Sequence, residues 1–225
     1  MPKQDSTKII SGKDLGQLAI DTFCLRCFWY ERKYGKAPGI FPGIFSTLDS
    51  ISKKSTKRSF LEAGKKPGWL SIEGIKRPIE FPRIHVIVNH GDWILTGVPD
   101  DVFEREDKGY HIVDYKTAKY TGTQDRLLPM YEVQLNAYAY ALPYHGIKPI
   151  THLSLIYCEP NENIENDQDF KLGFTTKVLH INLNTDMIPP LLIKARKILD
   201  STEPPEPYIN CKGICMWLDS LYGKK

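Results

Sequence analysis

The sequence predicts a single α/β domain over residues 1–225, with a mixed central β-sheet flanked by helices. Residues 84–119 are rich in strand-forming residues, and a helical segment, 130–142, and another apolar strand, 153–158, follow in the order of a β-α-β unit. A further strand, 177–183, and a helix, 187–200, continue the alternation. A chain of 225 residues that is 41% hydrophobic can bury one good core, so we expect no second domain.

The N-terminal region predicts a helix that carries two cysteines. Apolar residues recur at helical spacing, and Ser11 stands where an N-cap is needed, with Asp14 three positions later. The helix should end at Gly35. Cys24 and Cys27 would then lie one turn apart on the same face of this helix.

A second helix is expected after a connector rich in proline and glycine, residues 36–43. It should begin in a capping box at residues 46–49 and reach about Glu62. A basic stripe recurs on it at helical spacing, formed by Lys53, Lys54, Lys57 and Arg58. The stripe is compatible with contacts to a phosphate backbone, and a solvated helix face is the alternative.

The chain from Ile94 to Lys119 predicts a β-hairpin. Residues 94–103 and 110–115 are the two strands, and the polar segment between them supplies the turn. Residues 84–89 alternate in the same way and should form the first strand of the core sheet. If the turn is centred near Asp107, Asp100 and Asp114 face each other across the hairpin.

Asp114 and Lys116 share one face of the predicted strand, because side chains two residues apart on a strand point the same way. Directly opposed carboxylate residues have Cβ atoms about 5 Å apart and destabilise a sheet unless a cation lies between them. A hard divalent cation suits such oxygen ligands. The alternative is a solvated trio with a surface ion pair, but the apolar residues around Asp114 favour an interior strand, where unpaired charge is rarely tolerated.

Downstream elements complete the predicted fold. On the helix at 130–142, Gln134 and Tyr138 are four residues apart and therefore share a face. A charged loop should separate the strand at 153–158 from the strand at 177–183. The final helix, 187–200, has two prolines in its first turn, where they are tolerated.

Four of the five cysteines form two close pairs, Cys24 with Cys27 and Cys211 with Cys215. Four thiolates are the number that a [4Fe–4S] cluster or a tetrahedral zinc ion requires. We expect the pairs to converge on one metal centre that joins the N-terminal helix to the C-terminal tail. Four unligated buried thiols are the alternative.

Three motifs resemble those of the PD-(D/E)XK nuclease superfamily, and in particular of its RecB-like group, which includes the CRISPR-associated RecB-like exonucleases and the AddB nuclease domain. Residues 97–100, Gly-Val-Pro-Asp, resemble the Gly-x-x-Asp motif. Residues 113–117, Val-Asp-Tyr-Lys-Thr, resemble the hydrophobic-Asp-Tyr-Lys-Thr motif, and residues 134–138 resemble the Gln-x-x-x-Tyr helix. Their order and spacing make the resemblance specific over residues 94–142.

The resemblance implies a restriction-endonuclease-like core and a metal-dependent nuclease that hydrolyses DNA phosphodiester bonds. The catalytic residues that it implies are Asp100, Asp114, Lys116, Gln134 and Tyr138. Mg²⁺ or Mn²⁺ would be bound by Asp100, Asp114 and the backbone carbonyl of Tyr115. Many members of the group place a histidine on the helix before the Gly-x-x-Asp motif. This chain has Asp49 at that distance, where it is either a further ligand or a carboxylate near a helix N-terminus.

The resemblance also bears on cofactors and partners. Members of the group often clamp their termini with an iron–sulfur cluster, which favours iron over zinc at the four cysteines. DNA, single-stranded or at ends, is the implied substrate, with protein partners in a repair, recombination or phage/CRISPR-related processing complex. A catalytically silent nucleic-acid-binding protein with a nuclease fold and a structural zinc protein remain as alternatives.

Charge and hydropathy limit the possible binding partners and the cellular location of the protein. The net charge of +3 and the pI near 8.5 describe a mildly basic protein, compatible with a local basic face. No apolar run approaches the ~18 residues that span a bilayer, and the polar start lacks the apolar core of a signal peptide. We therefore expect a cytoplasmic protein with no membrane partner.

Overall fold

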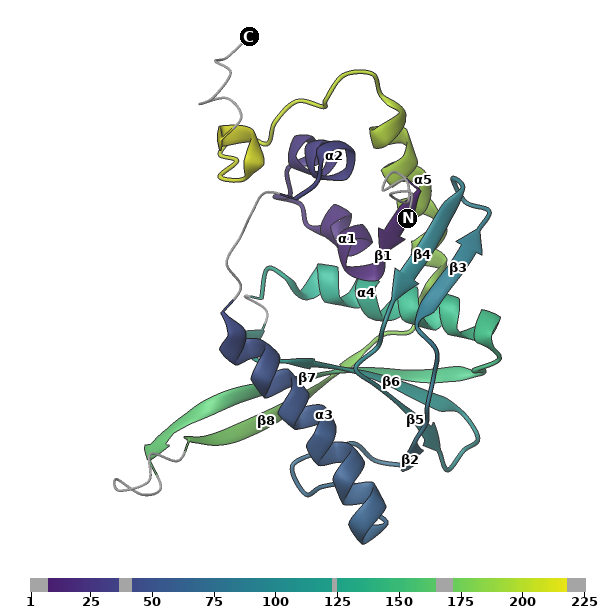
Figure 1. Ribbon diagram of the computed structural model, residues 1–225, viewed down its shortest axis with the longest axis vertical. Coiled ribbons are helices and arrows are strands. Elements are labelled where there is room, and N and C mark those ends of the chain that lie inside the picture. The colour runs from purple at the N-terminus through teal and green to yellow at the C-terminus, as the bar shows by residue number, and fades with distance from the viewer. Residues whose placement is uncertain (1–7, 37–41, 123–124, 165–171, 218–225) are drawn as a thin grey trace.

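In the computed structural model the chain forms two β-sheets with helices packed against them (Figure 1). The structure describes residues 8–36, 42–122, 125–164 and 172–217. The larger sheet has the order β2-β5-β6-β7-β8. Its strands are β2 (Ile75–Pro78), β5 (Asp101–Arg105), β6 (Tyr110–Lys116), β7 (Ile150–Ile164) and β8 (Leu172–Ile181).

The five-stranded sheet is mixed. Strands β6 and β7 are parallel, whereas β2 with β5, β5 with β6 and β7 with β8 are antiparallel. A parallel pair needs a long crossover connection, and helix α4 (Leu128–Ala141) lies within this one. This is the predicted β-α-β unit, and the mixed sheet flanked by helices confirms the predicted fold class.

Helices α3 (Gly43–Ala63) and α4 cover opposite faces of this sheet. The hydroxyl of Thr56 on α3 lies 3.2 Å from that of Tyr115, whereas Gln134 on α4 contacts the neighbouring Asp114. Adjacent residues on a strand point to opposite faces, so the two helices lie on opposite sides, as Figure 1 shows. A small apolar cluster fills the α3 side, and the main core fills the α4 side.

The smaller sheet corrects two expectations. It contains β1 (Ile9–Ser11), β4 (Trp93–Gly97) and β3 (Ile84–Val88), in that order. Residues 84–89 therefore do not begin the central sheet, and residues 94–103 are not one strand but β4 and β5 in different sheets. The chain changes sheets at residues 98–100, where Pro99 has no N–H to donate to a ladder.

The prediction of one continuous N-terminal helix is also wrong. The chain forms α1 (Gly12–Gly16), a 3₁₀ turn (Gln17–Ala19) and, after a break, α2 (Leu25–Tyr34). Asp21 and Thr22, both poor helix formers, are exposed in the break. The predicted cap is confirmed, because the Asp14 N–H donates to Ser11 Oγ at 3.0 Å.

The remaining elements differ mainly in their ends. Helix α3 begins before the expected capping box, directly after Pro42, which disfavours a helical residue before it. Strand β7 continues to Ile164 through much of the predicted charged loop, because it pairs with β8 as far as Leu172. Helix α5 (Ile188–Asp200) matches its prediction, and short 3₁₀ turns follow α4 at Leu142–His145 and precede α5 at Thr185–Met187. No helix in the described ranges has the length and apolar character needed to cross a membrane.

Candidate active site

The hairpin register brings two carboxylates together at one end of β6. Asp101 pairs with Val113, and Asp100 and Asp114 are the next residues along the two segments at that end of the hairpin. Asp100 Oδ2 accepts a hydrogen bond from the backbone N–H of Tyr115 at 2.8 Å. Burial, and then the charge of Asp114, raise the pKa of Asp100 to about 7. The site thus holds a buried carboxyl group, Asp114, and a half-buried one, Asp100, that repel each other.

Asp114 is held from the α4 side. Gln134 Nε2 donates to Asp114 Oδ1 at 3.1 Å and to the Tyr138 hydroxyl at 2.8 Å. Lys116 Nζ lies 2.5 Å from Asp114 Oδ2 and donates to Gln134 Oε1 at 3.4 Å. The ammonium group also lies over the ring of Tyr131, 4.2 Å from its centroid. The sequence-predicted Asp, Lys, Gln and Tyr therefore form one contiguous network.

Helix α3 contributes Lys53 to the candidate site. The sequence pattern had identified this residue only as part of the basic stripe. Lys53 Nζ lies 2.7 Å from Asp100 Oδ1 and also 2.7 Å from Asp49 Oδ2. Lys53 therefore lies between these two carboxylates. Asp49, Asp100 and Asp114 do not form a group with ligand atoms close enough to share one ion directly.

The basic stripe on α3 divides into two parts. Lys53 faces Asp100, and Lys57 Nζ lies 3.5 Å from Glu80 Oε1. Lys54 and Arg58 are exposed on the helix surface. Two of the four basic side chains are thus paired with carboxylates, and the other two are exposed to solvent, so the stripe matches neither predicted alternative as a whole.

Asp101 is a buried carboxylate that sequence reasoning missed. The Tyr115 hydroxyl donates to Asp101 Oδ2 at 2.8 Å, on the face of β6 that α3 covers. Burial raises the pKa of Asp101 to about 6. The doubled aspartate at positions 100 and 101 was the available signal, because neighbouring strand residues serve opposite faces.

The donor set suits a hard divalent cation. Asp100 and Asp114 offer carboxylate oxygens, and the buried Asp114 Oδ2 already has one cation beside it, the Lys116 ammonium at 2.5 Å. Mg²⁺ and Mn²⁺ prefer oxygen ligands of this kind. A cation beside Asp100 and Asp114 would offset the repulsion between their charges, so the residues present fit such an ion.

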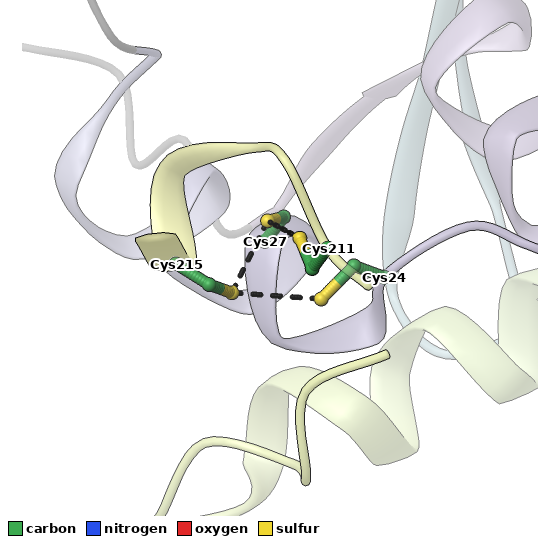
Figure 2. Close-up of side chains that lie close together, drawn as sticks. All are labelled: Cys24, Cys27, Cys211 and Cys215. Atoms are coloured by element: carbon green, nitrogen blue, oxygen red, sulfur yellow. Dashed lines mark hydrogen bonds between the residues drawn. The ribbon is translucent and has the colours of Figure 1, made fainter. Parts of the chain in front are cut away.

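The four predicted cysteines lie together, as Figure 2 shows. Their sulfur atoms all lie within 4.8 Å of one another. The closest Sγ–Sγ distances are 3.2 Å between Cys27 and Cys215, 3.3 Å between Cys27 and Cys211, and 3.5 Å between Cys24 and Cys215. All four are free thiols. The arrangement supplies a four-sulfur site that links the start of α2 to residues 211–215.

Backbone groups support thiolate ligands at this centre. The Tyr208 N–H donates to Cys24 Sγ at 3.4 Å, and the Gly213 N–H donates to Cys211 Sγ at 3.4 Å. Although burial opposes the effect, hydrogen bonds from the backbone of Tyr208 and Cys27 lower the pKa of Cys24 to about 7. Burial raises the pKa of Cys27 and of Cys215, so not every thiol of the group ionises readily by itself. Four sulfur atoms this close together are the donor set that zinc or an iron–sulfur cluster requires, so the residues present fit either metal.

Comparisons with known proteins identify the family. Residues 41–219 match the family model of the PD-(D/E)XK nuclease superfamily, well over half of the chain. No curated protein gives a significant match to the sequence. Among solved structures, "Crystal structure of SSO0001" is 14% identical with a TM-score of 0.46, covering 99% of this chain and 87% of that one. "Crystal Structure of LHK-Exo in complex with dAMP" is 8% identical with a TM-score of 0.43, covering 87% of this chain and 89% of that one.

Proposed function

Because the chain belongs to the PD-(D/E)XK nuclease superfamily, we propose that it is a Mg²⁺- or Mn²⁺-dependent deoxyribonuclease of the RecB-like group. The observation that carries the proposal is the network around Asp114. One buried carboxylate faces Asp100, contacts Lys116 and is held by Gln134, the residues that the three motifs supply. We further propose that residues 1–225 form one domain and act as a cytoplasmic exonuclease with partners in DNA repair, recombination or phage/CRISPR-related processing.

In this proposal Asp100, Asp114 and the backbone carbonyl of Tyr115 hold the ion. A bound divalent cation would lower the pKa of a water molecule and offset charge developing on the scissile phosphate. Lys116 would orient that water or stabilise the transition state, because its ammonium group is already fixed beside Asp114. Gln134 and Tyr138 would keep Asp114 in position and place the substrate strand.

Helix α3 would add cationic and acidic groups around this centre. Lys53 holds Asp100, and we propose that it supplies positive charge beside the single site formed by the two aspartates. Asp49 would contribute through Lys53, or as a further ligand if that ammonium group moves away. Lys54, Lys57 and Arg58 would contact substrate phosphates from the same helix.

The four cysteines would hold a [4Fe–4S] cluster, with Zn²⁺ as the alternative metal. The support is a compact four-sulfur group with backbone N–H donors to two of its sulfur atoms. This centre lies apart from the hairpin in sequence and structure. It would therefore serve the fold rather than the reaction.

The test is cleavage of labelled single- and double-stranded DNA with Mg²⁺, with Mn²⁺ and with EDTA. We expect metal-dependent cleavage that Asp114→Ala and Lys116→Ala each abolish while the fold persists. Asp186→Ala, which removes an exposed aspartate from a 3₁₀ turn, is the matched control and should cleave normally. Metal-dependent cleavage retained by Asp114→Ala would overturn the site assignment, and DNA binding without cleavage would favour the catalytically silent alternative.

A further inference from the structure

A cavity of about 350 Å³ lies between α3 and the strands β7 and β8. Nine described residues line it, and none of them is charged. Cavities of roughly 300 Å³ and above are the size at which proteins bind small organic groups. The cavity therefore has room for one small, uncharged chemical group.

The cavity lies on the α3 side of the sheet, at the same end of β6 as the proposed active site. Two of its lining residues are chain neighbours of the site lysines. Ser52 precedes Lys53, whose ammonium contacts Asp100, and Thr117 follows Lys116, whose ammonium contacts Asp114. Because adjacent strand residues point to opposite faces, a group in the cavity would approach the site from the side of Lys53 and Asp100, not from the side of Lys116 and Gln134.

Two aromatic side chains line this cavity. The Trp69 ring packs against the Tyr115 ring, with centroids 6.0 Å apart at 63°, so it is supported by the catalytic strand itself. The Phe174 side chain, on β8, is 38% exposed. A flat ring placed here would contact aromatic side chains. Stacking on such side chains is the way in which proteins bind nucleobases regardless of their identity.

The hydroxyl groups in the lining keep hydrogen-bonding capacity. Thr176 Oγ1 donates to the Trp69 carbonyl at 2.7 Å and can still accept a hydrogen bond. Ser55 Oγ accepts from Trp69 Nε1 at 3.4 Å and can still donate one. A ligand with a hydrogen-bond donor and an acceptor along one edge could therefore bond to the Thr176 and Ser55 hydroxyl groups.

We propose that this cavity binds one unpaired nucleobase of the substrate strand, beside the phosphate to be cleaved. A nucleotide joins a charged phosphate to a neutral, flat base, and in this molecule the uncharged aromatic cavity adjoins Lys53, whose ammonium contacts Asp100. A base in a duplex is paired and stacked, so it must leave the helix to enter the cavity. The substrate class is therefore single strands or frayed ends. The inference rests on the proposed nuclease function.

The test uses single-stranded oligonucleotides that each carry one abasic tetrahydrofuran residue at a different position. For the wild type we expect kcat/KM to fall about tenfold when the abasic residue lies at one position next to the cleaved bond, the effect of about 1.4 kcal/mol of stacking. Phe174→Ala should lose this discrimination, whereas Phe174→Tyr, which keeps the ring, should retain it. Tyr144→Ala removes an aromatic ring that is 61% exposed outside the cavity and should behave as the wild type.

Binding of the same strands in EDTA, followed by fluorescence anisotropy, separates the two proposals. Equal wild-type rates and affinities on intact and abasic strands at every position would overturn the base-binding cavity while leaving nuclease activity in place. The same holds if Phe174→Ala discriminates as strongly as the wild type. A wild type that cleaves neither strand, yet binds the intact one more tightly through Phe174, would overturn the nuclease function and support the cavity assignment.

Discussion

Gly97 connects two motifs that are separate in the sequence. A Cβ atom at this position would overlap the ring of Tyr138 at Cε1. The Tyr138 hydroxyl accepts a hydrogen bond from Gln134, which in turn holds Asp114. The glycine of the Gly-x-x-Asp segment therefore allows the close approach that positions Asp114 from α4.

Gly97→Ala should lower both stability and cleavage, because the new methyl group must displace the Tyr138 ring. We expect about 1–3 kcal/mol of destabilisation, measured by urea denaturation. In a Tyr138→Ala background the same substitution should cost markedly less, which a double-mutant cycle would reveal. Gly68→Ala, where a Cβ meets nothing within 4 Å, is the control. Additive effects of the two substitutions would show that the contact does not matter.

His111 is a buried histidine with no direct part in the proposed site. Its Nε2 lies 2.8 Å from Ser154 Oγ, and its Nδ1 has no hydrogen-bond partner. Burial, with nearby His152, Arg105 and His180 adding to it, lowers the pKa of His111 to about 3. The imidazole is therefore neutral in the folded protein over a wide pH range.

This lowered pKa makes stability fall as the solution becomes more acidic. Between pH 6.5 and pH 3 the unfolded chain binds a proton at His111 and the folded chain does not, so this residue costs about 1.4 kcal/mol of stability for each pH unit below 6.5. His111→Gln should flatten the acid limb of a denaturation–pH profile. His85→Gln, at an exposed strand position, should leave the profile unchanged. Identical acid limbs in the wild type and His111→Gln would contradict the assignment.

At the scale of elements, α1 is held against α4 by two glycines one turn apart. A Cβ at Gly12 would lie 3.1 Å from Ala137 Cβ, and one at Gly16 would overlap the Met130 carbonyl oxygen. Backbone contact of this kind requires residues without side chains. Because α4 carries Gln134 and Tyr138, the packing of α1 against α4 also helps to hold these two residues in the candidate site.

Gly16→Ala should push α1 away from α4 and destabilise the protein by about 1–3 kcal/mol, more than any gain in helix propensity. The control is Gly43→Ala in α3, where a Cβ meets nothing within 4 Å and helix propensity alone should act. Thermal denaturation would measure both. A Gly16→Ala protein as stable as Gly43→Ala would refute the close contact.

At the scale of the whole molecule, the cysteine group ties together parts of the chain that are remote in sequence. Cys24 and Cys27 come from the start of α2, and Cys211 and Cys215 come from the end of the described chain (Figure 2). A Cβ at Gly213 would lie only 2.8 Å from Cys27 Sγ, so the two segments meet closely. A metal bound here would close nearly the whole chain into one loop.

Cys211→Ser should remove the metal, bleach any visible absorbance from an iron–sulfur cluster and lower the melting temperature. Hydrogen exchange should rise first in residues 8–36 and 201–217, and later in β5 and β6, because the centre clamps the ends of the fold. Cys158→Ala is the control, since Cys158 lies in a different apolar cluster. Unchanged metal content and melting in Cys211→Ser would show that these thiols do not share a metal.

The sequence by itself determined the features that depend on local spacing. Strand periodicity and one polar turn give the register of β5 and β6, and with it the facing of Asp100 and Asp114. Helical spacing puts Gln134 and Tyr138 on one face of α4. The order of strand, helix and strand gives the β-α-β unit and hence the fold class. The convergence of the cysteines was also foreseen, from their number and pairing.

Only the tertiary structure decided how remote surfaces meet. Four features depend on which face of each helix packs against which sheet. They are the division into two sheets, the place of Lys53 between Asp49 and Asp100, the fit of Gly97 against Tyr138, and the cavity beside Trp69. The physical reason is that packing depends on the shapes and volumes of side chains from distant parts of the chain, whereas periodicity records only which residues share a face of one element.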